Sequence, residues 1–355
     1  MSAPPFGFVF ALCQPACQKW LKQEMAERHP ELRFAYNRPG LVTFKAQTPL
    51  ATSFRCEAAF ARHWGFSLGL ARTALEVKAL ASALPFAHLV VQVCSPPLPE
   101  ASSEVPARSA AELEAELVEA CGPTVEARQP RPGEWVLDVI VGPARPEEAA
   151  GPDEAAWLVG VHRHESGRSP HAGGPLAVPA SEASPSRAYS KIEEAIAWQT
   201  LPLLPGQRAL ELGAAPGGAV LALLERGLDV VALDPGLLDP SVVARAFELG
   251  RALTHLDKPA GALVAADLPE PVDWLLADMN LAPQVAVRAV ERAVGLTRKS
   301  LRGAVITLKM NDARAVSAIG SLLQRLAALK LGQPRAIQLP SNRSEIAVVL
   351  AGARR

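Results

Sequence analysis

The chain has little of several features that would assign it quickly to a class. Its 36 basic and 36 acidic residues cancel, so the total charge indicates no polyanionic partner. No apolar run reaches the roughly 18 residues that a membrane-spanning helix needs. The short apolar run at 6–12 has no positive charge ahead of it and does not fit a lipoprotein signal. We therefore expect a cytoplasmic protein with no membrane association.

Cysteine is scarce as well. There are five, an odd number with no Cys-x-x-Cys pair: Cys13, Cys17, Cys56, Cys94 and Cys121. This pattern favours reduced thiols in a cytoplasmic protein. His162, His164 and His171 are close in sequence, but no cysteine or acidic residue stands beside them at metal-ligand spacing. We therefore predict no metal site and expect these histidines in polar loops, as RNA contacts.

The length of 355 residues suits two or three domains. Residues 166–185 are dominated by Gly, Ser, Pro and Ala, a composition that predicts an interdomain linker. From Ser186 onward there are 20 basic and 16 acidic residues, against 16 and 20 before it. A weakly positive C-terminal part is compatible with RNA binding but does not require it.

Two α+β patterns precede this linker. A β-α-β-β order predicts a small domain over residues 1–80, and a strand, a helix and two strands predict a second over 81–165. The first is read from a strand at 7–12, a helix at 15–28 and a hairpin of 32–36 with 41–45. The second is read from a strand at 89–93, a helix at 109–120 and strands at 135–141 and 157–162.

Strands and helices alternate after the linker, which predicts an α/β open sheet, Rossmann-like, over residues 186–355. The expected strands are 208–212, 229–233, 261–265, 274–277, 304–308 and 346–350.

A glycine-rich turn follows the first of these strands. Gly213, Gly217 and Gly218 permit close backbone approach, and the helix that begins there offers free N–H groups to a ligand. The turn is neither Gly-x-Gly-x-x-Gly nor a Walker loop, because it lacks the Lys-Ser/Thr pair. The acidic Glu211 beside it suits a cationic ligand better than a pyrophosphate.

Two aspartates complete a candidate adenosine site. Asp234 ends the next expected strand, where a carboxylate can accept from ribose hydroxyls, and Asp267 can accept from an adenine amino group. Taken singly, each is as often a helix cap or a solvated turn residue.

Four ionisable residues surround this site in the order Lys-Asp-Lys-Glu. Asp278 and Lys309 each follow a short apolar run, while Lys191 starts a helix and Glu345 opens the last strand. Methyl transfer to a hydroxyl needs a base within hydrogen-bond reach. Lys309 suits this role if Lys191 and partial burial lower its pKa, with Asp278 and Glu345 orienting the two amines.

These motifs resemble those of the FtsJ-like ribose 2′-O-methyltransferases. The likeness lies in Ser-Arg-x-x-x-Lys-Ile-Glu-Glu-Ala from 186, Leu-Gly-Ala-Ala-Pro-Gly-Gly from 212, Asp278-Met and Leu-Lys309-Met. Within this class the chain most resembles the bacterial enzymes that methylate a cytidine ribose in the peptidyl-transferase loop of 23S rRNA. The likeness is strong after Pro185 and loose before Gly160.

The resemblance implies a ferredoxin-like domain at 1–80, a THUMP-like RNA-binding domain at 81–165 and S-adenosylmethionine as the methyl donor. It implies Lys191, Asp278, Lys309 and Glu345 as the catalytic tetrad, with Lys309 as proton acceptor. The cofactor residues that it implies are Ala188, Gly213, Ala215, Pro216, Gly217, Gly218, Asp234, Asp267 and Asp278. Ala215 stands where the family commonly has Cys. Ala188 stands where it has a Ser, which leaves that contact to backbone or to Ser190. The implied RNA is 23S rRNA or a large-subunit precursor.

Other functions stay open at this point. A nicotinamide-dependent oxidoreductase is disfavoured by the missing Gly-x-Gly-x-x-Gly motif. Base methylation would need an Asn/Asp-Pro-Pro-aromatic loop or a nucleophilic cysteine, and no cysteine follows Cys121. The remaining alternatives are a 2′-O-methyltransferase for tRNA or 16S rRNA and a non-catalytic RNA-binding or assembly protein that retains the fold.

Overall fold

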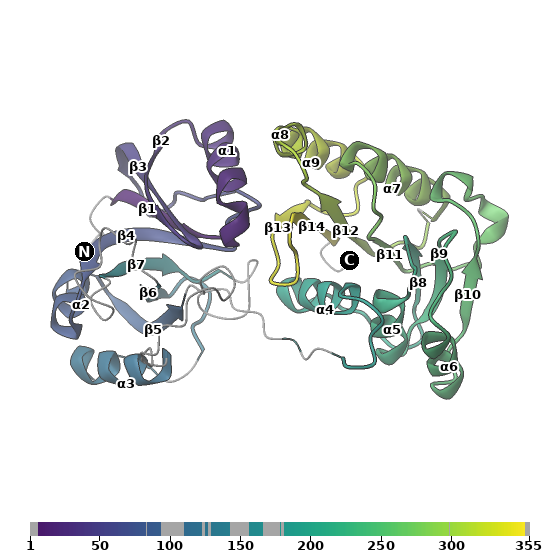
Figure 1. Cartoon of the computed structure of the whole chain (residues 1–355), viewed down its shortest axis with the longest axis horizontal. Coiled ribbons are helices and arrows are strands. Elements are labelled where there is room, and N and C mark those ends of the chain that lie inside the picture. The colour runs from purple at the N-terminus through teal and green to yellow at the C-terminus, as the bar shows by residue number, and fades with distance from the viewer. Residues whose placement is uncertain are drawn as a thin grey trace. The chain divides into compact units, whose positions relative to one another are not determined.

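The computed structural model describes residues 6–82, 84–93, 110–122, 125–126, 129–142, 156–165, 178, 181–297 and 299–351. The chain divides into two compact units, Met1–Pro175 and Leu176–Arg355, and each has a seven-stranded sheet (Figure 1). The boundary between them falls inside the expected linker, most of which lies outside the described residues.

The sheet of the N-terminal unit has the order β2-β3-β1-β4-β7-β6-β5. All neighbouring strands pair antiparallel except β5 and β6, which are parallel. The strands are β1 (Phe6–Leu12), β2 (Leu32–Arg38), β3 (Leu41–Leu50), β4 (His63–Ala71), β5 (Phe86–Val93), β6 (Trp135–Val141) and β7 (Trp157–Arg163). Strand β4 pairs with β7, so strands from both expected α+β regions form one continuous sheet.

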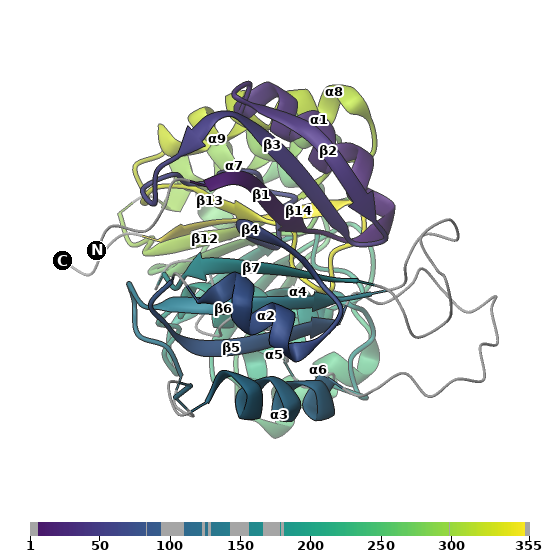
Figure 2. The ribbon, with the colours of Figure 1, turned by 90° about the vertical axis from the view of Figure 1, so that its left-hand side faces the viewer.

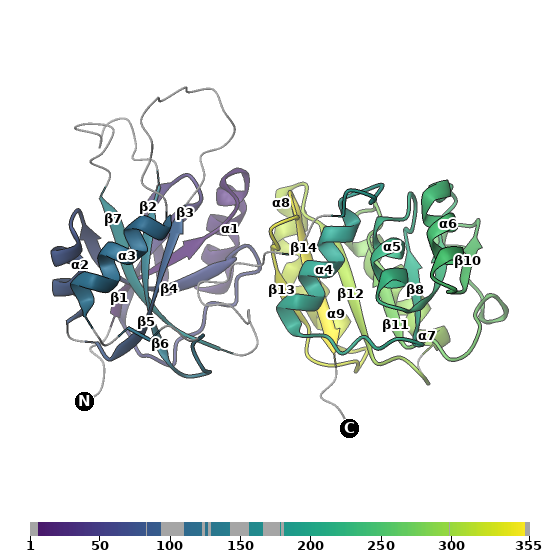
Figure 3. The ribbon, with the colours of Figure 1, turned by 90° about the horizontal axis from the view of Figure 1, so that it is seen from below.

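The helices of this unit are a short 3₁₀ turn η1 (Pro15–Cys17), α1 (Gln18–Arg28), α2 (Ala74–Ala81) and α3 (Ala110–Cys121). Helix α1 packs against β2 and β3 (Figure 2), while α2 and α3 pack against each other and against β4 and β5 (Figure 3). The cysteine thiols at 13, 17 and 56 are buried.

Strand β4 was not predicted, and its glycines explain why. Glycine is depleted in strands, so the segment with Gly65 and Gly69 has a weak strand pattern. The tertiary structure requires Gly65, because a Cβ there would lie 2.6 Å from the Val161 carbonyl oxygen and 2.7 Å from the Phe10 ring.

The sheet of the C-terminal unit has the order β10-β9-β8-β11-β12-β14-β13. Its strands are β8 (Arg208–Leu212), β9 (Asp229–Leu233), β10 (Leu253–Leu256), β11 (Trp274–Ala277), β12 (Gly303–Lys309), β13 (Arg335–Ile337) and β14 (Glu345–Ala351). Its helices are α4 (Ala188–Gln199), α5 (Gly218–Glu225), α6 (Pro240–Glu248), α7 (Pro283–Thr297), α8 (Ala313–Ser317) and α9 (Ile319–Ala327), with 3₁₀ turns η2 (Ala260–Ala262) and η3 (Ala265–Asp267).

Strands β8 to β12 are parallel, and β14 is antiparallel to β12. Helices α4, α5 and α6 lie on one face of the sheet and α7, α8 and α9 on the other (Figures 1 and 3). Burial on both faces explains the nearly continuous apolar runs of β9, β11 and β12. The predicted fold class is confirmed: an α/β Rossmann-like unit follows an α+β unit.

The prediction of a strand at 261–265 was wrong. Residues 261–265 lie in a loop with the 3₁₀ turns η2 and η3, and the third strand is instead β10, which pairs in parallel with β9. Pro259 and Gly261 disfavour a strand in that loop, and Leu263 alone within 260–266 is buried. None of the helices in the described part of the chain is both long and apolar enough to span a membrane.

Candidate active site

The order in which the chain adds strands to the sheet reverses between β8 and β11, and this topology creates the site. The chain proceeds from β8 through β9 to β10 on one side and then returns to place β11 on the other side of β8. Open α/β sheets bind ligands in the crevice at the carboxyl ends of such strands. The glycine turn follows β8 and Asp278 follows β11, and the Asp278 N–H donates to the Leu212 carbonyl at 3.1 Å.

The glycine turn is held in a conformation that larger residues would not allow. Gly213 has φ 82°, and a Cβ there would lie 2.7 Å from the Asp278 carbonyl oxygen. Gly217, with φ 113°, is the N-cap of α5. A Cβ on Gly218 would lie 2.2 Å from Ser186 Oγ and 2.8 Å from the Ser186 carbonyl oxygen. The first turn of α5 therefore packs directly on Ser186.

Ser186 is a residue that the sequence did not single out. Its Oγ lies 3.3 Å from the N–H of Ala188, the first residue of α4, which donates to it. Ser186 therefore links the start of α4 to the glycine turn, and Ala188 lies at that junction. The motif Ser186-Arg-x-x-x-Lys191 was the available signal, because it places this serine a fixed distance before the lysine.

Asp234 supports the turn from the end of β9. Its Oδ2 accepts from the Ala215 N–H at 3.1 Å, and its Oδ1 accepts from the Gly236 N–H at 2.7 Å. The Pro216 carbonyl accepts from the Asp239 N–H at 2.9 Å, which connects the turn to the start of α6. These bonds leave the half-buried Asp234 carboxylate fixed at the edge of the crevice.

Asp267 occupies a different setting. It ends η3, where one carboxylate oxygen lies 2.6 Å from Lys258 Nζ and the other accepts from the Val264 N–H at 2.8 Å. The bond to Lys258 and then the Val264 N–H lower the pKa of Asp267. The residue therefore stays ionised and holds its own loop together.

The four residues of the Lys-Asp-Lys-Glu set come together at the carboxyl edge of the sheet. Lys191 Nζ lies 2.9 Å from Asp278 Oδ2 and 3.1 Å from Glu345 Oε1. Lys309 Nζ lies 3.3 Å from Asp278 Oδ1 and 3.0 Å from Glu345 Oε1. Each amine thus contacts both carboxylates. The cluster is neutral in total and its four side chains are at most 17% exposed.

The electrostatics of Lys309 differ from the expectation. Burial does act to lower the pKa of the Lys309 amine, but Asp278 and Glu345 outweigh burial and raise it. The expected depression by Lys191 was wrong, because the two carboxylates lie between the amines. The Lys309 amine therefore holds its proton more tightly than an ordinary lysine does.

Glu345 is the fixed anion of the cluster. Burial raises the pKa of its carboxyl, but the Arg343 N–H and the two lysines more than offset burial and lower this pKa to about 2. The N–H of Arg343 lies 2.6 Å from Glu345 Oε2, while both lysines contact Oε1. Glu345 thus orients both amines without competing for a proton near neutral pH.

Glu194 is a second residue that the sequence did not reveal. It is buried on α4, and its carboxylate accepts from the Ser341 N–H at 2.8 Å and from the Ser341 hydroxyl at 2.6 Å. This contact ties the helix that carries Lys191 to the loop that leads into Glu345. In sequence it reads only as one half of a Glu-Glu pair, which is usually solvated.

Glu211 lies beneath the cluster, in a setting that favours the protonated form of its carboxyl. Burial, then Asp278 and Asp234, raise the pKa of the Glu211 carboxyl well above its usual value. It lines a cavity of about 20 Å³ together with Lys191, Asp278 and Thr307. Within the described part of the chain, Oε2 of this side chain has no hydrogen-bond partner. A cationic group bound in the crevice would favour its ionised form.

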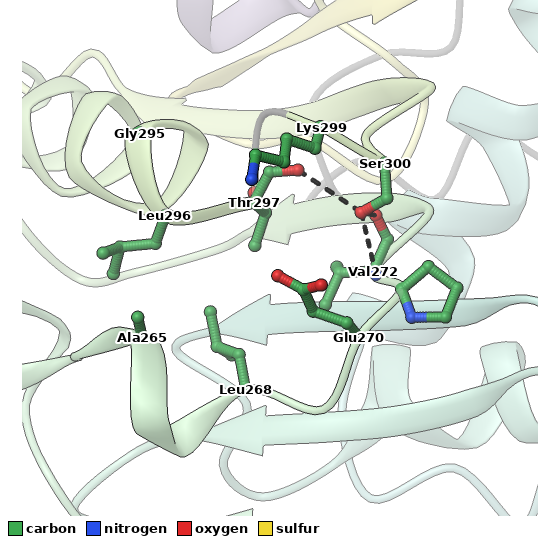
Figure 4. Close-up of a pocket in the computed structure, with 10 residues that line it drawn as sticks. Ala265, Leu268, Glu270, Val272, Gly295, Leu296, Thr297, Lys299 and Ser300 are labelled. Atoms are coloured by element: carbon green, nitrogen blue, oxygen red, sulfur yellow. Dashed lines mark hydrogen bonds between the residues drawn. The ribbon is translucent and has the colours of Figure 1, made fainter.

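A larger pocket, of about 790 Å³, lies at the opposite edge of the sheet (Figure 4). Its walls are the segments that precede β11 and β12, including Glu270, Val272, Thr297, Lys299 and Ser300. Ser300 Oγ donates to the Val272 carbonyl at 2.7 Å and accepts from the Val272 N–H at 3.0 Å. Its hydroxyl thus joins two segments of the fold, away from the tetrad.

His162 and His164 were expected in a polar loop, and that expectation was wrong. His162 is a buried residue of β7, and His164 follows that strand and is also buried. The expected absence of an acidic partner was wrong as well. Asp138 on β6 lies 2.6 Å from His162, because the two strands pair. His171 lies outside the described residues.

Comparisons with known proteins agree with the motifs. No family profile matches the sequence. The chain is 34% identical over 156 residues to the ribosomal RNA large subunit methyltransferase M of Alkalilimnicola ehrlichii, covering 41% of each chain. It is 32% identical over 203 residues to the protein of that name from Methylococcus capsulatus, covering 55% of this chain and 51% of the relative. The chain therefore matches about half or less of the length of these relatives.

Solved structures resemble the chain only weakly. They include TrmN from Thermus thermophilus, at 17% identity and a TM-score of 0.33 over 97% of this chain and 99% of that one. Fibrillarin from Aeropyrum pernix, with bound S-adenosylmethionine, has 17% identity and a TM-score of 0.35 over 46% and 75% of the two chains. Along about half of its length, the chain is thus similar to the ribosomal RNA large subunit methyltransferases M, the likeness that its motifs predicted.

Proposed function

We propose that the protein is an S-adenosylmethionine-dependent methyltransferase that acts on a ribose 2′-hydroxyl of RNA. The observation that carries the proposal is the ring of contacts among Lys191, Asp278, Lys309 and Glu345 at the carboxyl edge, next to the glycine turn. Bringing four charged side chains together in a nearly buried place costs free energy unless every charge is paired with an opposite one. Such clusters are typical of functional sites.

The cofactor would be held by the glycine turn and its neighbours. The turn at Gly213 and Gly217 permits close backbone approach, and the first turn of α5 offers N–H groups. Asp234 is proposed to accept from ribose hydroxyls. Asp278 would provide negative charge for a cation, and Glu211 would add to it on ionising. The donor itself supplies an electrophilic methyl group on a positively charged sulfur. Asp267 is proposed as the adenine contact, with Ala188, Ala215, Pro216 and Gly218 completing the lining.

The residues of the tetrad would position and deprotonate the acceptor. Lys309, made neutral by release of its own proton to solvent, would accept the proton of the ribose hydroxyl. Asp278 and Glu345 hold the two amines in place, and Lys191 balances their charge. A cation bound beside Asp278 weakens the hold of that carboxylate on Lys309. Donor binding therefore favours the neutral amine that the reaction requires.

The N-terminal unit is proposed to recognise RNA, with a ferredoxin-like part at 1–80 and a THUMP-like part at 81–165. Exposed aromatic rings beside cations support this proposal. Phe34 is 49% exposed and lies 4.0 Å below Lys22 Nζ, and Phe8 is 41% exposed near Lys45. Such rings can stack on unpaired bases while the amines contact phosphates.

The relatives' name leads us to propose large-subunit rRNA as the substrate. From the resemblance of the motifs we further propose a cytidine of the peptidyl-transferase loop in 23S rRNA as the target, and from the sequence a cytoplasmic location. The test is transfer of tritiated methyl from S-adenosylmethionine to unmodified 23S rRNA, with tRNA and 16S rRNA in parallel. A ribose product resists alkaline cleavage at one phosphodiester bond, whereas a methylated base does not. Transfer to tRNA or 16S rRNA alone would reassign the substrate.

Lys309→Met should separate an enzyme from a binding protein. Loss of a general base lowers the rate by about 10²- to 10⁴-fold. RNA binding should stay unchanged, and Lys330→Met, a change of an exposed residue after α9, should retain full activity. A wild-type protein that binds RNA but transfers no methyl would support the non-catalytic alternative.

A further inference from the structure

Three buried polar side chains meet within the N-terminal unit. They are His63 on β4, Asp138 on β6 and His162 on β7, whose side chains are 10%, 0% and 9% exposed. These three strands are neighbours in the order β4-β7-β6. Residues that are 75 and 24 positions apart in sequence thus converge on one place.

The geometry of this cluster brings one oxygen or nitrogen ligand from each residue together. His63 Nε2 lies 3.1 Å from Asp138 Oδ1, and His162 Nδ1 lies 2.6 Å from Asp138 Oδ2. Candidate ligand atoms of the three residues all lie within 4.8 Å of one another. The Gln92 amide donates to Asp138 Oδ1 at 3.0 Å and so orients the carboxylate.

Two glycines and one ring enclose the cluster. A Cβ on Gly160 would lie 2.4 Å from the Phe10 ring, and one on Gly65 would lie 2.7 Å from it, so this ring lies over the bare backbone of both. Its centroid is 5.6 Å from that of His63. The cluster is therefore shielded from water. In such a buried place, interactions between charges are stronger than at the surface.

An ionised carboxylate in such a buried place needs a compensating positive charge. Asp138 is fully buried, and each of its carboxylate oxygens contacts an imidazole nitrogen, Oδ1 that of His63 and Oδ2 that of His162. The compensating charge is either a proton on an imidazole or a metal ion between the three residues. Two imidazole nitrogens and one carboxylate oxygen form a ligand set typical of zinc.

We propose that His63, Asp138 and His162 bind a zinc ion through His63 Nε2, His162 Nδ1 and one carboxylate oxygen. On binding, each imidazole releases its proton or carries it on the other ring nitrogen, and the ion replaces the two contacts with Asp138. Three protein ligands leave one tetrahedral position for water or another small ligand. The ion would tie β4, β7 and β6 together, and it is independent of the proposed methyl transfer.

The test is titration of the full-length protein, stripped with a chelator, with Co²⁺ and then Zn²⁺. We expect one Co²⁺ per chain with the visible absorption of a tetrahedral site, displaced by Zn²⁺ in a 1:1 ratio. Zinc should also raise the melting temperature, while Mg²⁺ should not. A wild-type chain that shows neither Co²⁺ absorption nor a zinc-dependent melting shift would overturn the proposal and leave a proton as the only cation.

Substitutions of the three residues test whether each of them is a zinc ligand. His63→Gln, Asp138→Asn and His162→Gln should each weaken zinc binding by at least about 10²-fold, beyond the loss expected for changes outside the ligand set. His29→Gln is the matched control, because His29 is also buried in this unit but bonds to Glu31 and the Glu57 N–H. Unchanged affinity in all three ligand variants would refute the assignment. The wild-type titration decides the question if a variant does not fold.

Discussion

Lys309 and Glu345 face each other directly across the antiparallel pair β12 and β14, and Lys309 Nζ lies 3.0 Å from Glu345 Oε1. Because β14 runs against β12, its first residue lies at the edge where β12 ends. Two of the four tetrad members are thus placed by strand register alone. A slip of one residue would turn Glu345 to the other face of the sheet.

The raised pKa of Lys309 predicts a pH dependence of the reaction. Asp278 and Glu345 hold the pKa of this amine above the usual 10.5, so only the small neutral fraction can accept a proton. We expect the single-turnover rate to rise about tenfold per pH unit between pH 7 and 9. Donor affinity, measured by calorimetry over the same range, serves as the control. A rate that is flat over this range would show that Lys309 is not the proton acceptor.

The lowered pKa of Glu345 predicts that the free energy of unfolding falls in acid. Its pKa is about 2 in the folded chain and 4.5 in the unfolded chain, so its contribution is present above pH 4.5 and disappears as the pH falls toward 2. The shift corresponds to on the order of 3 kcal/mol. Urea unfolding should show Glu345→Gln less stable than wild type at pH 6, with the gap shrinking by pH 3. Glu248→Gln, an exposed change on α6, should show no such convergence. A gap independent of pH would contradict the assignment.

Asp234 predicts a selective loss of donor binding. Its carboxylate holds the Ala215 and Gly236 N–H groups, and charged hydrogen bonds of this kind contribute about 1.5–3 kcal/mol. Asp234→Ala should therefore weaken S-adenosylmethionine binding about 10- to 100-fold while RNA affinity stays within about twofold. Asp229→Ala changes a carboxylate at the other end of the same strand and is the matched control. Equal loss of RNA and donor binding would argue against separate sites.

The close packing of Gly218 against Ser186 predicts that a larger residue would clash at the start of α5. Gly218→Ala places a Cβ against the Ser186 hydroxyl and carbonyl, so the turn must shift, at a cost of about 1–3 kcal/mol. Donor affinity should fall with it. Gly320→Ala in α9 meets open space and should stabilise the protein by about 0.5–1 kcal/mol. Thermal unfolding of both variants checks this difference, and a Gly218→Ala protein that is as stable as wild type would show that Ser186 can move away.

The C-terminal sheet was largely predictable, because apolar runs of four to seven residues separated by helices signal buried parallel strands. The loop at 261–265 was misread for the same reason, since Leu263 and its neighbours imitate such a run. Strand β4 was missed because its glycines weaken the strand pattern, and Gly65 is there for its contacts with the distant residues Phe10 and Val161. Local patterns cannot report a requirement that arises only from tertiary packing.

The sequence alone determined the order of the motifs, the glycine turn and the four charged residues, because these depend on short spacings and on the ends of apolar runs. Only the tertiary structure decided the proton affinity of Lys309, which depends on two carboxylates contributed by β14 and by the loop after β11. It also decided the meeting of His63, Asp138 and His162, which sheet pairing brings together across long stretches of chain. Proton affinity and ligand geometry follow from distances in space, and sequence spacing does not fix those distances.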